Sequence, residues 1–119
     1  MWKWDSAKGE MAKDGLVVGR GYAGAPGYKN DPSKEAIKNK GPIPRGKWKI
    51  GSTIAKHPKL GPVAIRLTPD GHNARGRSGF LIHADSIKAP GTASEGCIIL
   101  PRAARVAISQ SEDKELEVV

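Results

Sequence analysis

A chain of 119 residues, of which 38% are hydrophobic and 27% charged, fits one globular domain, and we expect a single domain over residues 1–119. The formal net charge of +8 favours an anionic partner, either nucleic acid or the bacterial envelope, but the basic residues are scattered and do not alternate with aromatic ones. The composition therefore ranks the cell wall above nucleic acid, and we expect no nucleic-acid partner; the single cysteine excludes an internal disulfide.

The N-terminal half of the chain has the pattern of a hairpin followed by a long loop. Trp2 and Trp4 alternate with polar residues, and an apolar run resumes after a turn, which predicts a hairpin over residues 2–18. Residues 19–41 are rich in Gly, Pro, Asn, Asp and Lys, so we expect a loop with at most one helical turn, over residues 33–38. Such a loop is suited to form the rim of a binding cleft.

The remainder of the chain predicts short strands and one helix. Trp48 and Ile50 alternate with lysines, which places both on one face of a strand, and Pro101 suits the first position of a helix. The expected fold is mainly β: a single compact β-rich domain of twisted sheets or a sandwich, with one or two short helices. In chain order, we expect strands over residues 47–50, 63–67, 80–82 and 97–100, a helix over residues 101–108, and a last edge strand over residues 115–119.

The only cysteine, Cys97, lies where a flexible turn enters an apolar run. Gly96 allows the backbone to bend sharply there, which would expose the thiol and direct backbone amides toward a developing oxyanion. The alternative interpretation, a small buried hydrophobic residue, is the commoner fate of a lone cysteine. A base or a positive charge close to the sulfur would favour the catalytic interpretation.

His83 is the candidate base. It ends the apolar run 80–82, just as Cys97 begins another, and the loop between them contains a Pro-Gly turn that allows the two strand ends to meet. The alternative is a hydrogen-bonded histidine at a strand end. His57 is expected to be solvated, and His72 to lie in an exposed turn or at the rim of the cleft.

The order of these residues and their neighbours point to one family. All three histidines precede Cys97, which is the reverse of the order in papain-like and related amidase folds. The segments Gly79-Phe80-Leu81-Ile82-His83-Ala84-Asp85 and Ser94-Glu95-Gly96-Cys97-Ile98 resemble the His…Ser-x-Gly-Cys motif of the L,D-transpeptidase (YkuD-like) family. The segment 41–50 is similar to the strand entry of the same family. Among its members, the chain most resembles the small effectors that bacteria deliver by type VI secretion.

The resemblance implies roles for several residues. It makes Cys97 the nucleophile, His83 the general base and the amides of Gly96 and Cys97 the oxyanion donors, with Ser94 shaping the turn. Asp85 is a candidate to orient the imidazole or to bind substrate. The family has an arginine two positions after the cysteine where this chain has Ile99, and a basic residue where it has Glu95. Contact with a substrate carboxylate therefore falls to a basic residue elsewhere, and the candidates are Arg75, Arg77, Arg102 and, at the rim, His72.

The implied function is acyl transfer on peptidoglycan stem tetrapeptides, as an L,D-carboxypeptidase or L,D-transpeptidase, without a cofactor or metal. The partners would be the stem peptides, the secretion machinery and an immunity protein. Residues 1–5 lack the apolar stretch of a signal peptide and no run is long enough for a membrane span, so we expect synthesis in the cytoplasm, delivery by another route and action in the periplasm.

Three alternatives remain open. One is a sortase-like transpeptidase, which shares the order His, Cys, Arg. Another is a non-catalytic basic module that binds cell wall or nucleic acid. The most remote is a zinc site built from His72, His83, Asp85 and Cys97, whose spacing matches no common ligand pattern.

Overall fold

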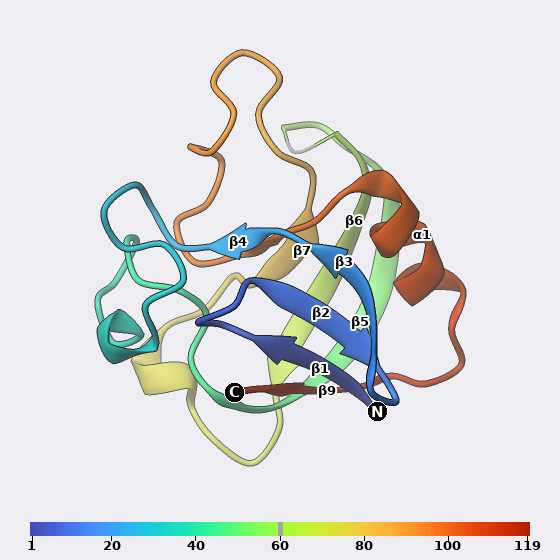
Figure 1. Ribbon diagram of the computed structural model, residues 1–119, viewed down its shortest axis with the longest axis horizontal. Helices are drawn as coiled ribbons and strands as arrows, with labels where there is room; N and C mark the ends of the chain where they lie inside the picture. Colours follow the sequence, from blue (N-terminus) through green and yellow to red (C-terminus); the bar gives the residue numbers. More distant parts are fainter. Residues whose placement is uncertain (60) are drawn as a thin grey trace.

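The computed structural model, which describes residues 1–59 and 61–119, confirms the predicted mainly β class. In these ranges the strands form one mixed nine-stranded sheet in the order β3-β2-β1-β9-β5-β6-β7-β8-β4 (Figure 1). The sheet is curled around the core, and a single α-helix packs against it within the described part of the chain. The elements are β1 (Trp2–Asp5), β2 (Glu10–Lys13), β3 (Leu16–Arg20), β4 (Tyr22–Ala23), η1 (Pro32–Lys34), β5 (Gly46–His57), β6 (Gly61–Pro69), η2 (Ala74–Gly76), β7 (Leu81–His83), β8 (Ile98–Ile99), α1 (Arg102–Gln110) and β9 (Glu115–Val118).

The N-terminal segment is a three-stranded meander rather than the single hairpin that the sequence predicts. Trp2 and Trp4 of β1 are buried as expected, but the segment after the first turn is itself a strand, β2, which pairs with both β1 and β3. Asp14 and Gly15 both have positive φ and form a tight turn between β2 and β3. The apolar residues at the start of β3, led by Leu16 at 75% exposure, therefore lie outside the core.

The C-terminal strand β9 lies inside the sheet, so its prediction as an edge strand is wrong. It pairs in parallel with β1 on one side and antiparallel with β5 on the other. Leu116 and Val118 are buried, while the alternating Glu115 and Glu117 stand opposite lysines of β5 in the register. The alternation that identified the strand was correct, but a period of two does not reveal how many neighbours a strand has.

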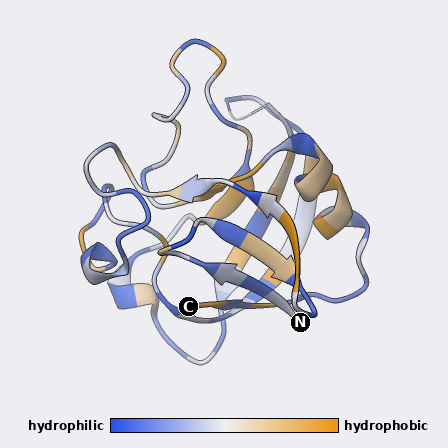
Figure 2. Cartoon of the chain, viewed as in Figure 1, coloured by the Kyte–Doolittle hydropathy of each residue, from blue (hydrophilic) through white to orange (hydrophobic). Residues whose placement is uncertain are grey.

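The strands β5 and β6 form the long antiparallel pair at the middle of the sheet. Trp48 and Ile50 are both buried on the inner face, as their alternation predicts. Helix α1 covers the same core with Ala104 and Ile108, and it begins one residue after Pro101. Figure 2 shows that β7 is hydrophobic, while most connecting loops are hydrophilic. None of the helices within the described ranges has the length and hydropathy of a bilayer-spanning segment.

The parallel pair β7 and β8 lies near one end of the sheet and is followed by β4. Because β4 pairs with β8, the segment 19–41 contains a short strand that its Gly- and Pro-rich composition had concealed. Ile82 stands opposite Ile98, and His83 opposite Ile99, in the β7–β8 register. The loop 84–96, orange in Figure 1, connects the two strands and projects from the body of the molecule.

Candidate active site

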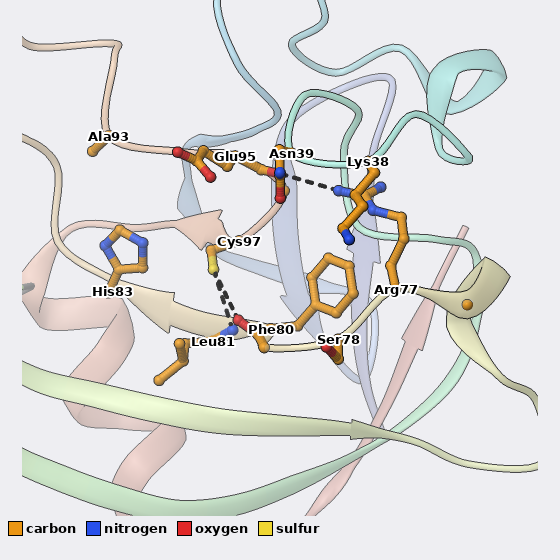
Figure 3. Close-up of a pocket in the computed structure, with 13 residues that line it drawn as sticks. Lys38, Asn39, Arg77, Ser78, Phe80, Leu81, His83, Ala93, Glu95 and Cys97 are labelled. Carbon is orange, nitrogen blue, oxygen red and sulfur yellow. Dashed lines mark hydrogen bonds between the residues drawn. The ribbon is translucent and has the colours of Figure 1, made fainter.

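A cavity of about 410 Å³ opens beside the β7–β8 pair. One wall consists of β7 with the turn that enters β8, and the opposite wall is contributed by a loop that precedes β5 (Figure 3). His83 and Cys97 both line this cavity. The remaining lining residues are Lys38, Asn39, Gly76, Arg77, Ser78, Gly79, Phe80, Leu81, Ala93, Glu95 and Gly96.

Sheet register brings the imidazole and the thiol to the same wall. Cys97 immediately precedes the Ile98 that pairs with Ile82, so it lies beside Leu81, whose amide donates to Sγ over 3.4 Å. Side chains two residues apart on a strand share a face, which places His83 on the cavity side next along β7. In Figure 3, both side chains border the same space. Because the strands are parallel, His83 stands opposite Ile99 rather than Cys97, and the two side chains share the cavity from positions offset along the pair.

The resting thiol does not bond to the imidazole in the described part of the chain. Its partners are the Leu81 amide and, over a long 3.8 Å contact, the carbonyl of Gly79. Hydrogen bonds between catalytic groups are often long or misaligned before substrate binds and tighten in the substrate complex.

A backbone carbonyl holds the imidazole. The distance from Nδ1 of His83 to the carbonyl oxygen of Ala84 is 2.8 Å, and because a carbonyl only accepts, Nδ1 carries the proton in this bond. The neutral ring therefore has Nε2 as its proton acceptor. Asp85 does not hold the ring. Its carboxylate instead accepts from the Tyr22 hydroxyl and from the amides of Ser86 and Gly91, so it braces the loop 84–96.

Burial keeps the imidazole neutral. His83 is 2% exposed, and burial is the main cause that lowers its pKa below the ordinary value. The bond to Ala84 opposes this shift, while the positive charge of Arg105 on α1 adds to it. A neutral imidazole near pH 7 is the form that can act as a base.

Burial also keeps Cys97 protonated, because it is the largest influence on the thiol and raises its pKa. The Leu81 amide and the charge of Arg77 lower the pKa, whereas the neighbouring carboxylate of Glu95 raises it further. The resting pair is therefore a neutral thiol beside a neutral imidazole. Proton transfer must accompany the attack of sulfur, since a thiolate is not formed in advance.

Ser94 fixes the turn that carries the cysteine. Its buried Oγ accepts from the amides of Gly24 at 2.9 Å and Gly96 at 3.0 Å, and it donates to the carbonyl of Cys97 at 2.7 Å. The bond to Ser94 occupies the Gly96 amide, which corrects the expectation that this amide stabilises an oxyanion. The Cys97 amide is among the groups that lower the pKa of the thiol, and it remains the candidate donor on this turn.

Gly96 contributes its backbone conformation instead. Its φ is +144°, and a Cβ at this position would lie 2.6 Å from Nη2 of Arg77 and 2.9 Å from the ring of Phe80. A larger residue would therefore force the turn or its neighbours to move. The requirement for glycine before the cysteine is steric.

Arg77 lines the cavity, but its guanidinium is committed to the backbone. It is only 9% exposed, its Nη atoms donate to four carbonyls, and it lies over the ring of Phe80. These bonds connect the loop before β5 to the turn before Cys97. They give Arg77 a structural role in place of the substrate contact that the sequence predicts. The four carbonyls belong to Glu35, Gly41, Pro42 and Glu95.

The other predicted binding residues lie elsewhere. His72 and Arg75 line a separate cavity, where His72 bonds to the Lys47 carbonyl and Arg75 pairs with Glu35. Arg102 is exposed at the start of α1 and does not line the cavity of Cys97.

The four residues of the zinc alternative are likewise not gathered at one point, because His72 lies in that separate cavity. In residues 1–59 and 61–119, no three His, Cys, Asp or Glu side chains lie close enough together to hold a metal ion.

Sequence reasoning missed several groups at the site. The Leu81 amide and the Ala84 carbonyl are backbone atoms, so no side-chain pattern could identify them. Lys38 lies in a segment whose composition predicts only a loop, and Arg105 acts on the imidazole from a helix that packs behind it. The sequence contained one signal for the position of Arg105. It lies three residues before the buried Ile108, and residues at this spacing share a face of a helix, here the inner face of α1.

Comparison with known families places this geometry in context. A model of the Tlde1 domain matches residues 18–119, which include the whole cavity. The chain belongs to the Tlde1 domain family. Tlde1 domains are type VI secretion effector domains, and membership indicates a secreted effector whose partners include the secretion machinery and an immunity protein. No curated protein sequence matches the chain.

Proposed function

We propose that this Tlde1 domain is a cysteine acyltransferase that removes or exchanges the terminal D-amino acid of peptidoglycan stem tetrapeptides. The observation that carries the proposal is the shared cavity of Cys97 and His83, in which the bond to Ala84 leaves Nε2 as the acceptor nitrogen. The family match and the positive net charge, which suits the anionic cell envelope, support the same conclusion.

The first half-reaction forms a thioester. As Sγ of Cys97 attacks the carbonyl carbon of the third stem residue, Nε2 of His83 takes the thiol proton. The carbonyl oxygen gains negative charge, and in this proposal the Cys97 amide donates to it. When the peptide bond breaks, His83 passes the proton to the leaving nitrogen, and a free D-amino acid departs.

The second half-reaction consumes the thioester. His83 takes a proton from the acceptor, the acceptor attacks the same carbonyl carbon, and as the C–S bond breaks His83 returns the proton to sulfur, which regenerates the thiol. Water as acceptor yields a tripeptide, a free D-amino acid gives exchange, and the amine of another stem gives a cross-link. Hydrolysis or exchange in the periplasm of a competing cell would deprive it of donor stems, which gives an antibacterial effect.

Purified tetrapeptide muropeptides test the chemistry directly. The protein, Cys97→Ala and His83→Ala are incubated with the same substrate, and the products are separated by chromatography. We expect tripeptide or exchanged product with the unaltered protein alone. Because Cys97 is the only cysteine, intact-protein mass spectrometry should also detect the thioester as one added acyl mass that hydroxylamine removes. Equal product from all three proteins contradicts the proposal.

A cellular assay tests the site of action. Directed to the periplasm of a sensitive bacterium, the protein should cause swelling or lysis, and Cys97→Ala should abolish the effect. The same protein kept in the cytoplasm should be harmless. A non-catalytic wall-binding module would instead bind purified wall equally with and without the thiol and give no thiol-dependent product.

A further inference from the structure

A second cavity, of about 290 Å³, lies where η1, the entry to β5 and η2 come together. It is lined by Glu35, which follows η1, by Arg45, which precedes β5, and by Arg75 of η2. In Figure 1, η1 and η2 lie on the same side of the molecule. Of the described residues that line this cavity, none also lines the cavity of Cys97, so the proposed reaction makes no use of it.

One buried carboxylate orients both arginines. The side chain of Glu35 is only 7% exposed, and its Oε1 accepts from Nε of Arg45 at 2.6 Å, while its Oε2 accepts from Nε of Arg75 at 3.0 Å. Burial by itself raises the pKa of Glu35, but the hydrogen bonds from the two arginines outweigh burial and lower it, so the carboxylate stays charged. Because both arginines contact the same carboxylate, their guanidinium groups lie side by side.

The outer nitrogens of these two guanidinium groups are open to a ligand. The side chains of Arg45 and Arg75 are 50% and 60% exposed, and within residues 1–59 and 61–119 their Nη atoms donate to no protein acceptor. Glu35 is the one acidic residue among the described residues that line the cavity, and both of its oxygens already accept hydrogen bonds. The cavity therefore presents two positive charges against one negative charge.

The turn that carries Arg75 is held in an unfavourable conformation. Ala74 and Arg75 have φ of +53° and +57°, a region that residues with a Cβ rarely adopt. His72 fixes this turn, because its Nδ1 accepts from the Ala74 amide at 3.1 Å and its Nε2 donates to the Lys47 carbonyl at 2.8 Å. Backbone strain of this kind is concentrated at ligand-binding and active sites, where the surrounding structure imposes it.

We propose that Arg45 and Arg75 form a binding site for a phosphate group, separate from the cavity of Cys97. One guanidinium is enough to pair both oxygens of a carboxylate, whereas a phosphate group has enough oxygens to accept from two guanidinium groups at once. In this site Glu35 positions the two arginines and His72 positions the turn. The phosphate belongs either to a lipid headgroup at a membrane surface or to a soluble ligand.

Titration with inorganic phosphate, followed by NMR at constant ionic strength, tests the site. We expect saturable shifts of the Nε signals of Arg45 and Arg75, with a Kd of about 1 mM, which is within the range of two charge-assisted contacts. Arg75→Lys keeps the charge and the possibility of pairing with Glu35 but lacks the planar fork, so it should weaken binding about tenfold. Arg20→Lys is the matched control, because Arg20 donates through Nε to Glu10 outside this cavity, and it should leave the Kd unchanged.

Thermal unfolding separates a loss of binding from a loss of fold. The unaltered protein should melt at a higher temperature in saturating phosphate than in chloride of the same ionic strength, since the ligand stabilises the folded state. Arg75→Lys and Arg45→Lys should each unfold cooperatively but gain little from phosphate. A response that does not saturate, an equal weakening in Arg20→Lys, or an equal gain in the lysine variants overturns the proposal.

Sedimentation with vesicles identifies the source of the phosphate. If the site takes a lipid headgroup, vesicles of phosphatidylglycerol in phosphatidylcholine should bind Arg75→Lys more weakly than the unaltered protein, although the net charge is the same. Equal vesicle binding by the two proteins, with binding of inorganic phosphate still dependent on Arg75, assigns the site to a soluble ligand. Both results support the phosphate site. None of these measurements requires turnover, so failure of the proposed reaction leaves them unaffected.

Discussion

The two walls of the cavity are built differently. The wall that holds His83 and Cys97 is made of paired strands and a turn fixed by the buried Ser94, and its imidazole is only 2% exposed. The opposite wall, which carries Lys38, is an exposed loop segment held through its backbone. The two residues proposed to react therefore depend on the sheet, whereas Lys38 lies where substitution costs little stability.

This contrast predicts how substitutions divide. A change in the strand wall should reduce stability and activity together, because the same bonds support both. A change of side chain on the loop wall, as at Lys38, should leave the free energy of unfolding within about 0.5 kcal/mol of its original value.

Gly96→Ala should have the largest effect on the strand wall. The new Cβ would overlap Arg77 and Phe80, and alanine disfavours the positive φ of this position. We expect a loss of about 3 to 5 kcal/mol in the free energy of unfolding and activity as low as that of Cys97→Ala. Urea denaturation and the muropeptide assay measure the two effects. Gly71→Ala, with φ +81° and open space at Cβ, is the control and should lose only about 1 kcal/mol.

Ser94→Ala should come next. It leaves the amides of Gly24 and Gly96 without their buried acceptor, and it removes the donor to the Cys97 carbonyl. The expected cost is about 2 to 3 kcal/mol, with a lower kcat because the turn is loosened. Ser52→Ala on the exposed face of β5 should change neither quantity. Full activity in Ser94→Ala would show that the turn does not depend on these three hydrogen bonds.

Tyr22→Phe should have a smaller effect, because it loosens only the loop 84–96. The hydroxyl donates to Asp85 at 2.6 Å and accepts from the amide of Ala93 at 3.0 Å, and burial is the first cause that raises the pKa of Tyr22 to about 12. We expect a loss of about 1 kcal/mol and faster amide hydrogen exchange in the loop. Unchanged exchange there would contradict the bracing role of this hydroxyl.

The pH dependence of stability should show the smallest effect. Burial lowers the pKa of His83 in the folded chain, so below about pH 6.5 the unfolded chain binds the proton first. The free energy of unfolding should therefore decrease as pH falls from about 6.5 to the folded pKa, and then level off. Urea denaturation at several pH values between 8 and 5 measures the free energy of unfolding of the protein and of His83→Gln. We expect the difference between the two to change over this range. A difference that stays constant would show that the ring does not titrate in this way.

Side-chain patterns predicted the class of fold and the core of the site. Apolar alternation identified the strands around Trp48 and the buried run that ends at His83, and the motif around Cys97 identified a second residue that lines the cavity. These features are local, since each depends on residues close together in the sequence. These local features were sufficient to predict that His83 and Cys97 lie close to one another.

The errors arose where position depends on distant partners or on backbone atoms. The strand β9 appeared to be an edge because its alternation carries no information about β1 on its far side. The Gly96 amide was assigned to the oxyanion because Ser94 was not known to occupy it. Asp85 and Arg77 are charged and close in sequence to the site, yet bonds to Tyr22 and to backbone carbonyls determine their roles.

The internal place of β9 affects the order in which the sheet can form. Because β9 pairs with both β1 and β5, the first residues of the sheet cannot join the rest until residues 115–118 are available. Long-range pairing of this kind slows folding, because the cost of closing a long loop must be met before the contacts of β9 can stabilise the sheet.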